Sequence, residues 1–239
     1  RELIKTKYKV TYNRRYVCSI LKQLGLSYQK GKFIPDKDVS EARKLWKDNT
    51  WPALLEKAKR ENAVILFQDE ASFALWGSLS YTWGLKGQQP LVKTTGKRKK
   101  LKAFGVIDYF SGRFIFETVE GKLNSSSYIT FLKRVLRSFS KKIILVHDSA
   151  PYHKSQAVKT FVEQEQRLET EPLPSYSPEF NIIEYLWKKV KSRIHNIYCD
   201  NFEALKKHVR KSLRYFQKRR SEVLILCNSY INMMIKYAL

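Results

Sequence analysis

The sequence has little of several residue types, and each shortage argues against a class of protein. It contains three cysteines, and Cys18, Cys199 and Cys227 are scattered without a Cys-x-x-Cys pair. This pattern supports neither a disulfide framework nor a zinc ribbon, and it favours a reducing cytoplasm. No apolar run approaches the roughly 18 residues of a membrane helix, and no signal peptide is visible. We therefore expect no membrane association.

Acidic side chains are also scarce. The 239 residues include 22 Asp and Glu against 46 Lys and Arg, which gives a formal net charge of +24. Such a field favours a polyanionic partner, and nucleic acid fits it best. The apolar content of 43% is enough for a real core, in one large domain or in one domain with an appendage. Because the chain starts at Arg1 rather than at Met, we expect a fragment or a trimmed form.

A small basic unit is predicted over residues 1–34. Apolar side chains recur at helical spacing over residues 14–24, Thr11 or Asn13 can cap this helix, and Gly25 can end it. The outward basic side chains that could bind DNA are Arg14, Arg15 and Lys22. The pattern resembles the recognition helix and wing of a winged helix-turn-helix. Too little sequence precedes it for the supporting helices, so we expect a partial module; a basic surface helix on the main domain is the alternative.

The rest of the chain predicts an α/β domain with helical flanks. Residues 35–62 form a helical linker broken at 49–52 by proline, residues 63–220 form the main domain, and residues 221–239 form a C-terminal helix. The expected strands are 64–69, 102–109, 113–120, 143–147 and 168–172, with helices at 126–139, 155–165, 179–195 and 202–218. This order is that of the ribonuclease H-like fold, a mixed five-stranded sheet flanked by helices.

Two stretches of the main domain look suited to nucleic acid. An insertion at 75–101 places aromatic side chains beside a basic run, and such residues can stack bases and neutralise phosphates. The DNA-binding candidates in it are Trp83, Lys97, Arg98, Lys99 and Lys100. The alternative is a solvated, mobile loop. Residues 188–220 contain only two acids among many cations, so they favour a surface for the DNA backbone, with Lys188 and Lys191 as candidates.

Three acidic residues fall where their side chains can converge. Asp69 and Asp148 each follow an apolar run that reads as a buried strand, and Glu184 lies in a helical pattern after a turn. Each alone is more often a turn, cap or surface residue. Together they offer the oxygen ligands that Mg²⁺ and Mn²⁺ prefer, and two such ions about 3.5–4 Å apart can promote phosphodiester cleavage. The sequence therefore predicts a nuclease or strand-transfer centre with two divalent cations, Mg²⁺ or Mn²⁺.

Three neighbours of these acids are candidates for supporting roles. Glu70 should face away from the aspartate beside it, as strand neighbours do, and be structural or support the metal ligands indirectly. Asn181 lies one turn before Glu184, where it can steady that carboxylate, touch DNA or cap the helix. His153 can contact a scissile phosphate, orient Asp148, or bond the backbone at a helix start.

Three ordered motifs resemble those of the DDE transposases of the mariner-like superfamily, specifically its bacterial insertion-sequence branch. They are FQDEASF at 67–73, HDSAPYH at 147–153 and LPSYSPEFNIIEYLW at 173–187. Between Asp148 and Glu184 lie 35 residues, close to the short spacing of the family. The likeness extends from about residue 10 to about residue 220. Ser149 replaces the usual Asn and Ile182 replaces the usual Pro, and neither change removes an expected ligand.

The resemblance implies a mechanism and a set of partners. Asp69, Asp148 and Glu184 would bind the metal ions, water would free a 3′-hydroxyl at the element's end, and that hydroxyl would attack target DNA, commonly at TA. The implied partners are double-stranded DNA of the terminal inverted repeats and of the target, and a second copy in a homodimer. The implied location is the bacterial cytoplasm, at the nucleoid. A ribonuclease H-like nuclease without strand transfer and a domesticated, non-catalytic DNA-binding protein remain alternatives.

Overall fold

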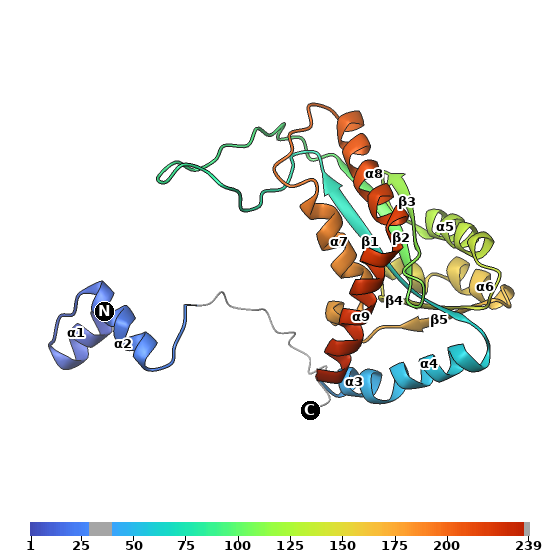
Figure 1. Cartoon of the computed structure of the whole chain (residues 1–239), viewed down its shortest axis with the longest axis horizontal. Helices are drawn as coiled ribbons and strands as arrows, with labels where there is room; N and C mark the ends of the chain where they lie inside the picture. Colours follow the sequence, from blue (N-terminus) through green and yellow to red (C-terminus); the bar gives the residue numbers. More distant parts are fainter. Residues whose placement is uncertain (29–39, 237–239) are drawn as a thin grey trace. The chain divides into compact units, whose positions relative to one another are not determined.

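The computed structural model describes residues 1–28 and 40–236 (Figure 1). The chain divides into two compact units, one ending at Lys37 and one beginning at Asp38, and each is described by itself. The boundary expected between residues 34 and 35 and the end of the expected wing lie outside the described residues. Within the described ranges, none of the helices combines the length and the apolar character that a bilayer crossing requires.

The first unit is a pair of short helices, α1 (Glu2–Tyr8) and α2 (Arg14–Gln23). Asn13 caps α2 as expected, because its side-chain oxygen accepts a hydrogen bond of 2.8 Å from the backbone N–H of Arg15. Gly25 follows the helix with a φ of 77°, a conformation that costs glycine little. One short helix, α1, precedes the expected recognition helix, and none of its residues is buried.

The second unit begins with an unbroken helical arm: α3 (Ser40–Leu45), the π-helical turn η1 (Trp46–Thr50) and α4 (Trp51–Arg60). The break expected near Pro52 was wrong, because this proline lies in the first turn of α4, where a missing N–H is tolerated. The N–H of Trp51 bonds to the carbonyl of Trp46 across the π-turn, five residues back. Both indole rings are therefore buried in the same core.

A mixed five-stranded sheet forms the centre, as the sequence predicted. Its strands are β1 (Val64–Ala74), β2 (Lys100–Asp108), β3 (Phe114–Glu120), β4 (Ile143–His147) and β5 (Leu168–Pro172). Their order is β3-β2-β1-β4-β5, with β1–β2 and β2–β3 antiparallel and β1–β4 and β4–β5 parallel. β1 is longer than expected because it stays paired with β2 as far as Ala74 and Lys100. Residues 75–99 therefore make up the insertion.

Helices cover both faces of this sheet (Figure 1). α5 (Ser125–Ser138) and α6 (Gln156–Gln164) pack on the face that holds Val64 and Leu66. The other face holds Ile65 and Phe67. It is covered by α4 and by α7 (Ile182–Ser192), α8 (Phe202–Lys218) and α9 (Arg220–Lys236). Because side chains alternate along β1, its successive residues serve opposite layers.

The start of α7 differs from the expected start at residue 179. A 3₁₀ turn, η3 (Pro178–Phe180), comes first, and α7 begins at Ile182. Asn181 is consequently at the N-cap position and Glu184 lies in the first turn of the helix. This shift sets where both side chains lie relative to the sheet.

Candidate active site

The two aspartates lie level with each other on adjacent parallel strands, Asp69 within β1 where its pairing with β4 ends and Asp148 just past the end of β4. In the register between β1 and β4, Phe67 pairs with Val146, so two residues further along Asp69 comes level with Asp148. β4 ends at His147, and Asp148 is therefore the first residue past the strand. In open α/β sheets, ligands bind in the crevice beyond the carboxyl ends of strands. The topology brings these two carboxylates together, as the sequence predicted.

Glu184 joins them from the helical layer. A cleft of about 420 Å³ is lined by Asp69, Asp148 and Glu184, together with Asn181, Lys154 and residues 173–178. The charge of Glu184 also acts on Asp69, where it is among the causes of a raised pKa. The structure thus places the three expected acids around one cleft.

Glu70 is closer to this centre than the sequence suggested. Carboxylate oxygens of Asp69, Glu70 and Asp148 lie within 4.8 Å of one another, a group that among the described residues does not include Glu184. Glu70 does project to the α5/α6 face, where it accepts a hydrogen bond of 2.8 Å from Gln68 Nε2. Although Glu70 faces the other side of the sheet, its carboxylate still lies close to those of the two aspartates.

Burial and neighbouring carboxylates disfavour the charged forms of both aspartates, and a bound cation would offset this effect. Burial raises the pKa of Asp69 to about 8, and the neighbouring charges of Glu184 and Glu70 add to this increase. Burial, followed by the charge of Glu70, also raises the pKa of Asp148, although the N–H of Ala150 donates to its Oδ1 at 3.1 Å and opposes the shift. Both groups resist ionisation in the protein alone.

The donor set fits a hard divalent cation. Every candidate ligand is a carboxylate, and oxygen ligands of this kind suit Mg²⁺ and Mn²⁺ rather than softer metals. Asp69 is 7% exposed and has acidic neighbours, so a cation bound among them would offset both its desolvation and the repulsion. The residues present therefore fit the metal site that the sequence predicted.

His153 lies behind Asp148, with a side chain that is only 2% exposed. Its Nδ1 is 2.9 Å from the backbone oxygen of Asp148, which can only accept, so Nδ1 carries a proton in this contact. Its Nε2 is 3.6 Å from Glu70 Oε1. Burial opposes ionisation of Glu70, but the polar side chains of His153, Tyr152 and Gln68 lower its pKa. This placement favours the orienting role that we considered for His153 over direct contact with DNA.

Asn181 connects α7 to the central strand. Its Nδ2 donates a hydrogen bond of 3.0 Å to the backbone oxygen of Gln68, one residue before Asp69. It makes no side-chain cap hydrogen bond, so the capping role was wrong. Its Oδ1 is buried without a hydrogen-bond partner among the described residues, and the residue lines the cleft. Asn181 therefore fixes the helix that carries Glu184 against the strand that carries Asp69.

Gln68 is a site residue that the sequence reading missed. It is fully buried in β1, where its side chain bonds to Glu70 and its carbonyl accepts from Asn181. A signal was available, because a glutamine inside an otherwise apolar strand needs buried hydrogen-bond partners. Through these two hydrogen bonds, Gln68 contacts Glu70 on one face of the sheet and Asn181 of the helical layer on the other.

The expected DNA-binding side chains are spread over several surfaces. Those on α2 are exposed, and so are those of the insertion, where Trp83 is 99% exposed. Lys99 lies over the ring of Phe202 at 4.0 Å, and Lys100 lies 5.6 Å from that of Trp76. The exposed side chains in this group are Arg14, Arg15, Lys22, Lys97, Arg98, Lys99, Lys100 and Lys188. Within the second unit, none of these side chains lines the cleft that holds the acids.

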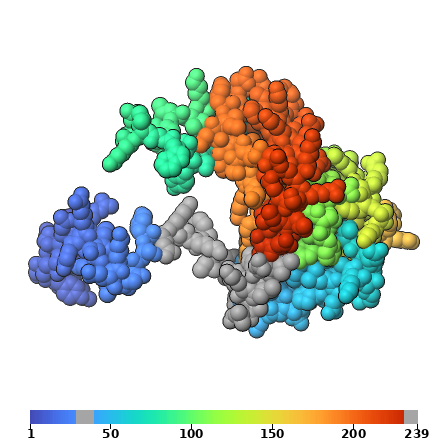
Figure 2. All heavy atoms as spheres, in the orientation of Figure 1, coloured from blue at the N-terminus to red at the C-terminus, as the bar shows by residue number. Residues whose placement is uncertain are grey.

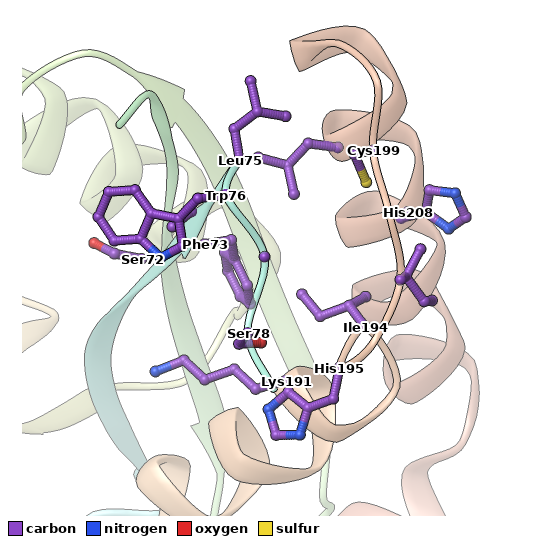
Figure 3. A pocket seen from close by; sticks show the side chains of 14 residues that line it. Ser72, Phe73, Leu75, Trp76, Ser78, Lys191, Ile194, His195, Cys199 and His208 are labelled. Carbon is purple, nitrogen blue, oxygen red and sulfur yellow. The ribbon is translucent and has the colours of Figure 1, made fainter. Parts of the chain in front are cut away.

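Lys191 lines a different cavity from the one with the acids. This cavity of about 250 Å³ lies between the end of β1 and the segment that joins α7 to α8. Lys191, His195 and Ser78 lie together at one end of it, and Cys199 lies at the other (Figure 3). Lys191 thus lies on the side of α7 that faces the insertion.

A mixed sheet with one acid on a central strand, one just past the adjacent parallel strand and one in the first turn of a covering helix defines a ribonuclease H-like nuclease domain. The family described as DDE superfamily endonuclease matches residues 64–206, which is more than half of the chain. The chain belongs to this family. A second family, described as winged helix-turn helix, matches residues 1–50.

Individual relatives agree with this assignment. The chain is 26% identical over 218 residues to the transposable element Tc1 transposase of Caenorhabditis elegans, covering 80% of this chain and 73% of that protein. The mariner Mos1 paired-end complex with Mg is similar in structure, with a TM-score of 0.62, 20% identity, and coverage of 98% and 73% of the two chains. A Mos1 paired-end complex with the left transposon end is also similar, with a TM-score of 0.60 and 19% identity. The match covers 95% of this chain and 73% of the Mos1 chain. At these identities the structures show a shared fold.

Proposed function

We propose that this chain is a DNA transposase that cuts a mobile element from DNA and joins it to a target. The observation that carries the proposal is the convergence of Asp69, Asp148 and Glu184 on one cleft, in a chain with a net charge of +24. The Tc1 and Mos1 relatives are transposases, which supports transposition over simple nuclease activity. Mos1 paired-end complexes with Mg and with Mn support the choice of cation.

In this proposal the three acids hold two divalent cations, which when bound stabilise charge on the attacking and the leaving oxygen. The chain's own residues prepare that arrangement. His153 holds the backbone of Asp148 at the end of β4, and Asn181 holds α7 against β1. Lys154, which is exposed and lines the cleft, is placed to bind a phosphate oxygen of the DNA.

The finer parts of the proposal concern partners and origin. The substrates are the terminal inverted repeats and target DNA, with insertion at TA. A homodimer would bring two element ends together, and the exposed insertion with Trp83 and Leu91 offers a surface for such contacts. The resemblance of the three acidic motifs is the basis for proposing the bacterial insertion-sequence branch, and hence action at the nucleoid. The proposed division is a DNA-binding unit at 1–34, a linker at 35–62, a catalytic domain at 63–220 and a C-terminal helix at 221–239.

The direct test compares Asp148→Ala with Asp200→Ala, a variant that removes an exposed acid outside the cleft. With Mg²⁺ or Mn²⁺ and a labelled duplex that carries the element end, wild type and Asp200→Ala should nick the end. Asp148→Ala should not, while it still binds the duplex. Equal cleavage by both variants would contradict the assignment.

Two further assays separate the alternatives. With ends that are already cleaved, a transposase gives a joined product, whereas a ribonuclease H-like nuclease without strand transfer gives none. A domesticated DNA-binding protein would show no change in melting temperature on adding Mg²⁺ or Mn²⁺, because it would have no functional cation site. Joined product together with a cation-dependent increase in melting temperature supports the proposal.

A further inference from the structure

The outer side of α8 forms a basic groove remote from the acids. The groove has a volume of about 670 Å³, larger than the 420 Å³ cleft. Its lining residues are Arg193, Glu203, Lys206, Lys207, Arg210, Lys211, Arg214, Tyr215 and Lys218. Only one of these is an acid. In Figure 2 this segment is orange and lies on the surface of the molecule.

The exposed cations of the groove form one stripe because of helical spacing. Lys207, Lys211, Arg214 and Lys218 are separated by four, three and four residues, and all four are exposed. The apolar side of the helix is buried in the core. The ends of the stripe are eleven residue steps apart, so at a rise of 1.5 Å per residue the stripe is about 16 Å long. The groove is thus a rigid row of charges on a helix that the core holds in place.

Most of this charge has no counterpart in the protein. Lys206 pairs with Glu120 at 2.7 Å and with Glu203. No acidic side chain within the described residues forms an ion pair with any of the four cations of the stripe. Like charges at this spacing on a helix repel one another, so the row costs stability unless an external anion binds to it.

Arg193 adds to the groove from the end of α7. Its guanidinium lies 3.7 Å from the ring centre of Tyr215, a contact that holds the group in place. Arg219 also lies over this ring, at 4.0 Å, but it pairs with Glu222 at 3.3 Å. The charge of Arg193 therefore stays available to a ligand. From Glu184 to Arg193 is about 14 Å along the helix axis, so the groove lies well away from the cleft.

We propose that this groove binds the phosphate backbone of duplex DNA at a site separate from the carboxylate cleft. The row is about as long as five successive phosphates of one strand, which are roughly 3.4 Å apart along the helix axis. A membrane surface does not fit, because such a helix exposes an apolar side, and no large apolar side chain of α8 is exposed. The inference adds a second contact surface for the DNA of the proposed function, and it can be tested apart from that function because phosphate binding here needs no cleavage.

The test uses the full chain in EDTA, so that cleavage plays no part, with a fluorescent duplex of about 30 base pairs and unrelated sequence. The groove variant combines Lys207→Gln, Lys211→Gln and Arg214→Gln. A matched variant combines Lys133→Gln, Arg137→Gln and Lys141→Gln, three exposed cations on or next to α5, which covers the other face of the sheet. Both variants lose three positive charges. Anisotropy titrations over a series of KCl concentrations give the slope of log affinity against log salt.

The groove variant should show a slope that is shallower by about 2.7, or about 0.9 for each lost phosphate contact, and the matched variant should keep the wild-type slope. Equal changes in both variants, or none in either, would overturn the proposal. So would a groove variant that keeps its duplex affinity but loses affinity for single-stranded RNA. If the triple variant melts earlier than wild type, Lys211→Gln alone replaces it, and an unchanged slope in that variant also overturns the proposal. A chain that fails to cut DNA but passes this test would refute the proposed function and leave this inference intact.

Discussion

The carboxylate cleft and the α8 groove differ in the sign of their charges and in how far those charges are exposed to solvent. In the cleft, a few acids lie close together beside the buried central strands, and burial raises the pKa of Asp69 to about 8. In the groove, several solvent-exposed cations lie on one face of a helix. Buried charges interact strongly and depend on exact neighbours, whereas exposed charges are screened and act as a sum. The cleft should therefore respond sharply to single substitutions, and the groove should respond gradually.

The largest effect is expected from Asp69→Asn. Loss of one cation ligand should remove several kcal/mol of transition-state stabilisation, which corresponds to a decrease in cleavage rate of about 10³-fold or more. The same variant should be more stable than wild type in EDTA. Because the folded pKa of Asp69 is raised from 3.8 to about 8, the metal-free wild type loses stability as pH rises through that range.

Melting curves in EDTA check this second part. The variant should melt close to wild type near pH 4 and several degrees above it near pH 8, since asparagine does not ionise. If the difference in melting temperature were the same at both pH values, repulsion in the cleft would not explain it.

Glu70→Gln should have the next largest effect and tests whether the cleft depends on the opposite face of the sheet. The substitution keeps the shape of the side chain but removes the charge beside Asp148 and His153. Loss of such a supporting carboxylate costs about 10- to 100-fold in metal affinity or activity. Titration of the melting temperature with Mn²⁺ measures the affinity. Glu163→Gln, an exposed acid on α6, serves as the control and should match wild type.

Gly105→Ala tests whether the position of Glu184 depends on packing. A methyl group on Gly105 would lie 2.7 Å from the ring of Trp187 and 2.9 Å from Ile183, both on α7. Overpacking of this kind costs about 1–3 kcal/mol, so denaturant unfolding should show a lower free energy. Cleavage should decrease further than the loss of folded protein explains, because α7 carries Glu184. Activity that tracks only the folded fraction would show that the cleft tolerates movement of α7.

Lys211→Gln should have the smallest effect. Removal of one exposed cation should make the salt slope of DNA binding shallower by about 0.9. It should leave the melting temperature equal to that of wild type or slightly higher, because it removes repulsion from the row. Lys133→Gln on α5 is the matched control. A loss of binding from this single change as large as that of the triple variant would mean that the groove, like the cleft, depends on an individual residue.

Much of the fold could be predicted from local patterns. β4 and β5 were predicted to the residue, because apolar runs of strand length read clearly between turns. α8 was also predicted to the residue, since Asn201 caps it and its apolar side chains recur at helical spacing. The π-turn at η1 could not be predicted, because two tryptophans that the core buries together outweigh a local signal to break the helix.

The acids of the site and their convergence were predicted from the sequence, but the details of their arrangement were not. Asp69 was expected to end its strand, whereas β1 continues to Ala74 and parallel pairing with β4 brings Asp69 level with Asp148. Glu70 was expected to be structural or to support the metal ligands indirectly, yet its carboxylate lies beside those of both aspartates. Alternation along a strand predicts which face a side chain takes and not how far its oxygen reaches. Likewise, the role of Asn181 depends on a hydrogen bond to a strand more than a hundred residues earlier.

The sequence by itself determined the chemistry of this protein: an excess of cations, three spaced acids and the strand and helix pattern that carries them. These features are local or additive, so composition and periodicity reveal them. The tertiary structure decided which acids share a cleft, which face of α8 is left without counterions, and which polar side chains hold the acids in place. Those outcomes depend on distances between residues far apart in the chain, and such distances exist only once the sheet and its two helical layers are packed.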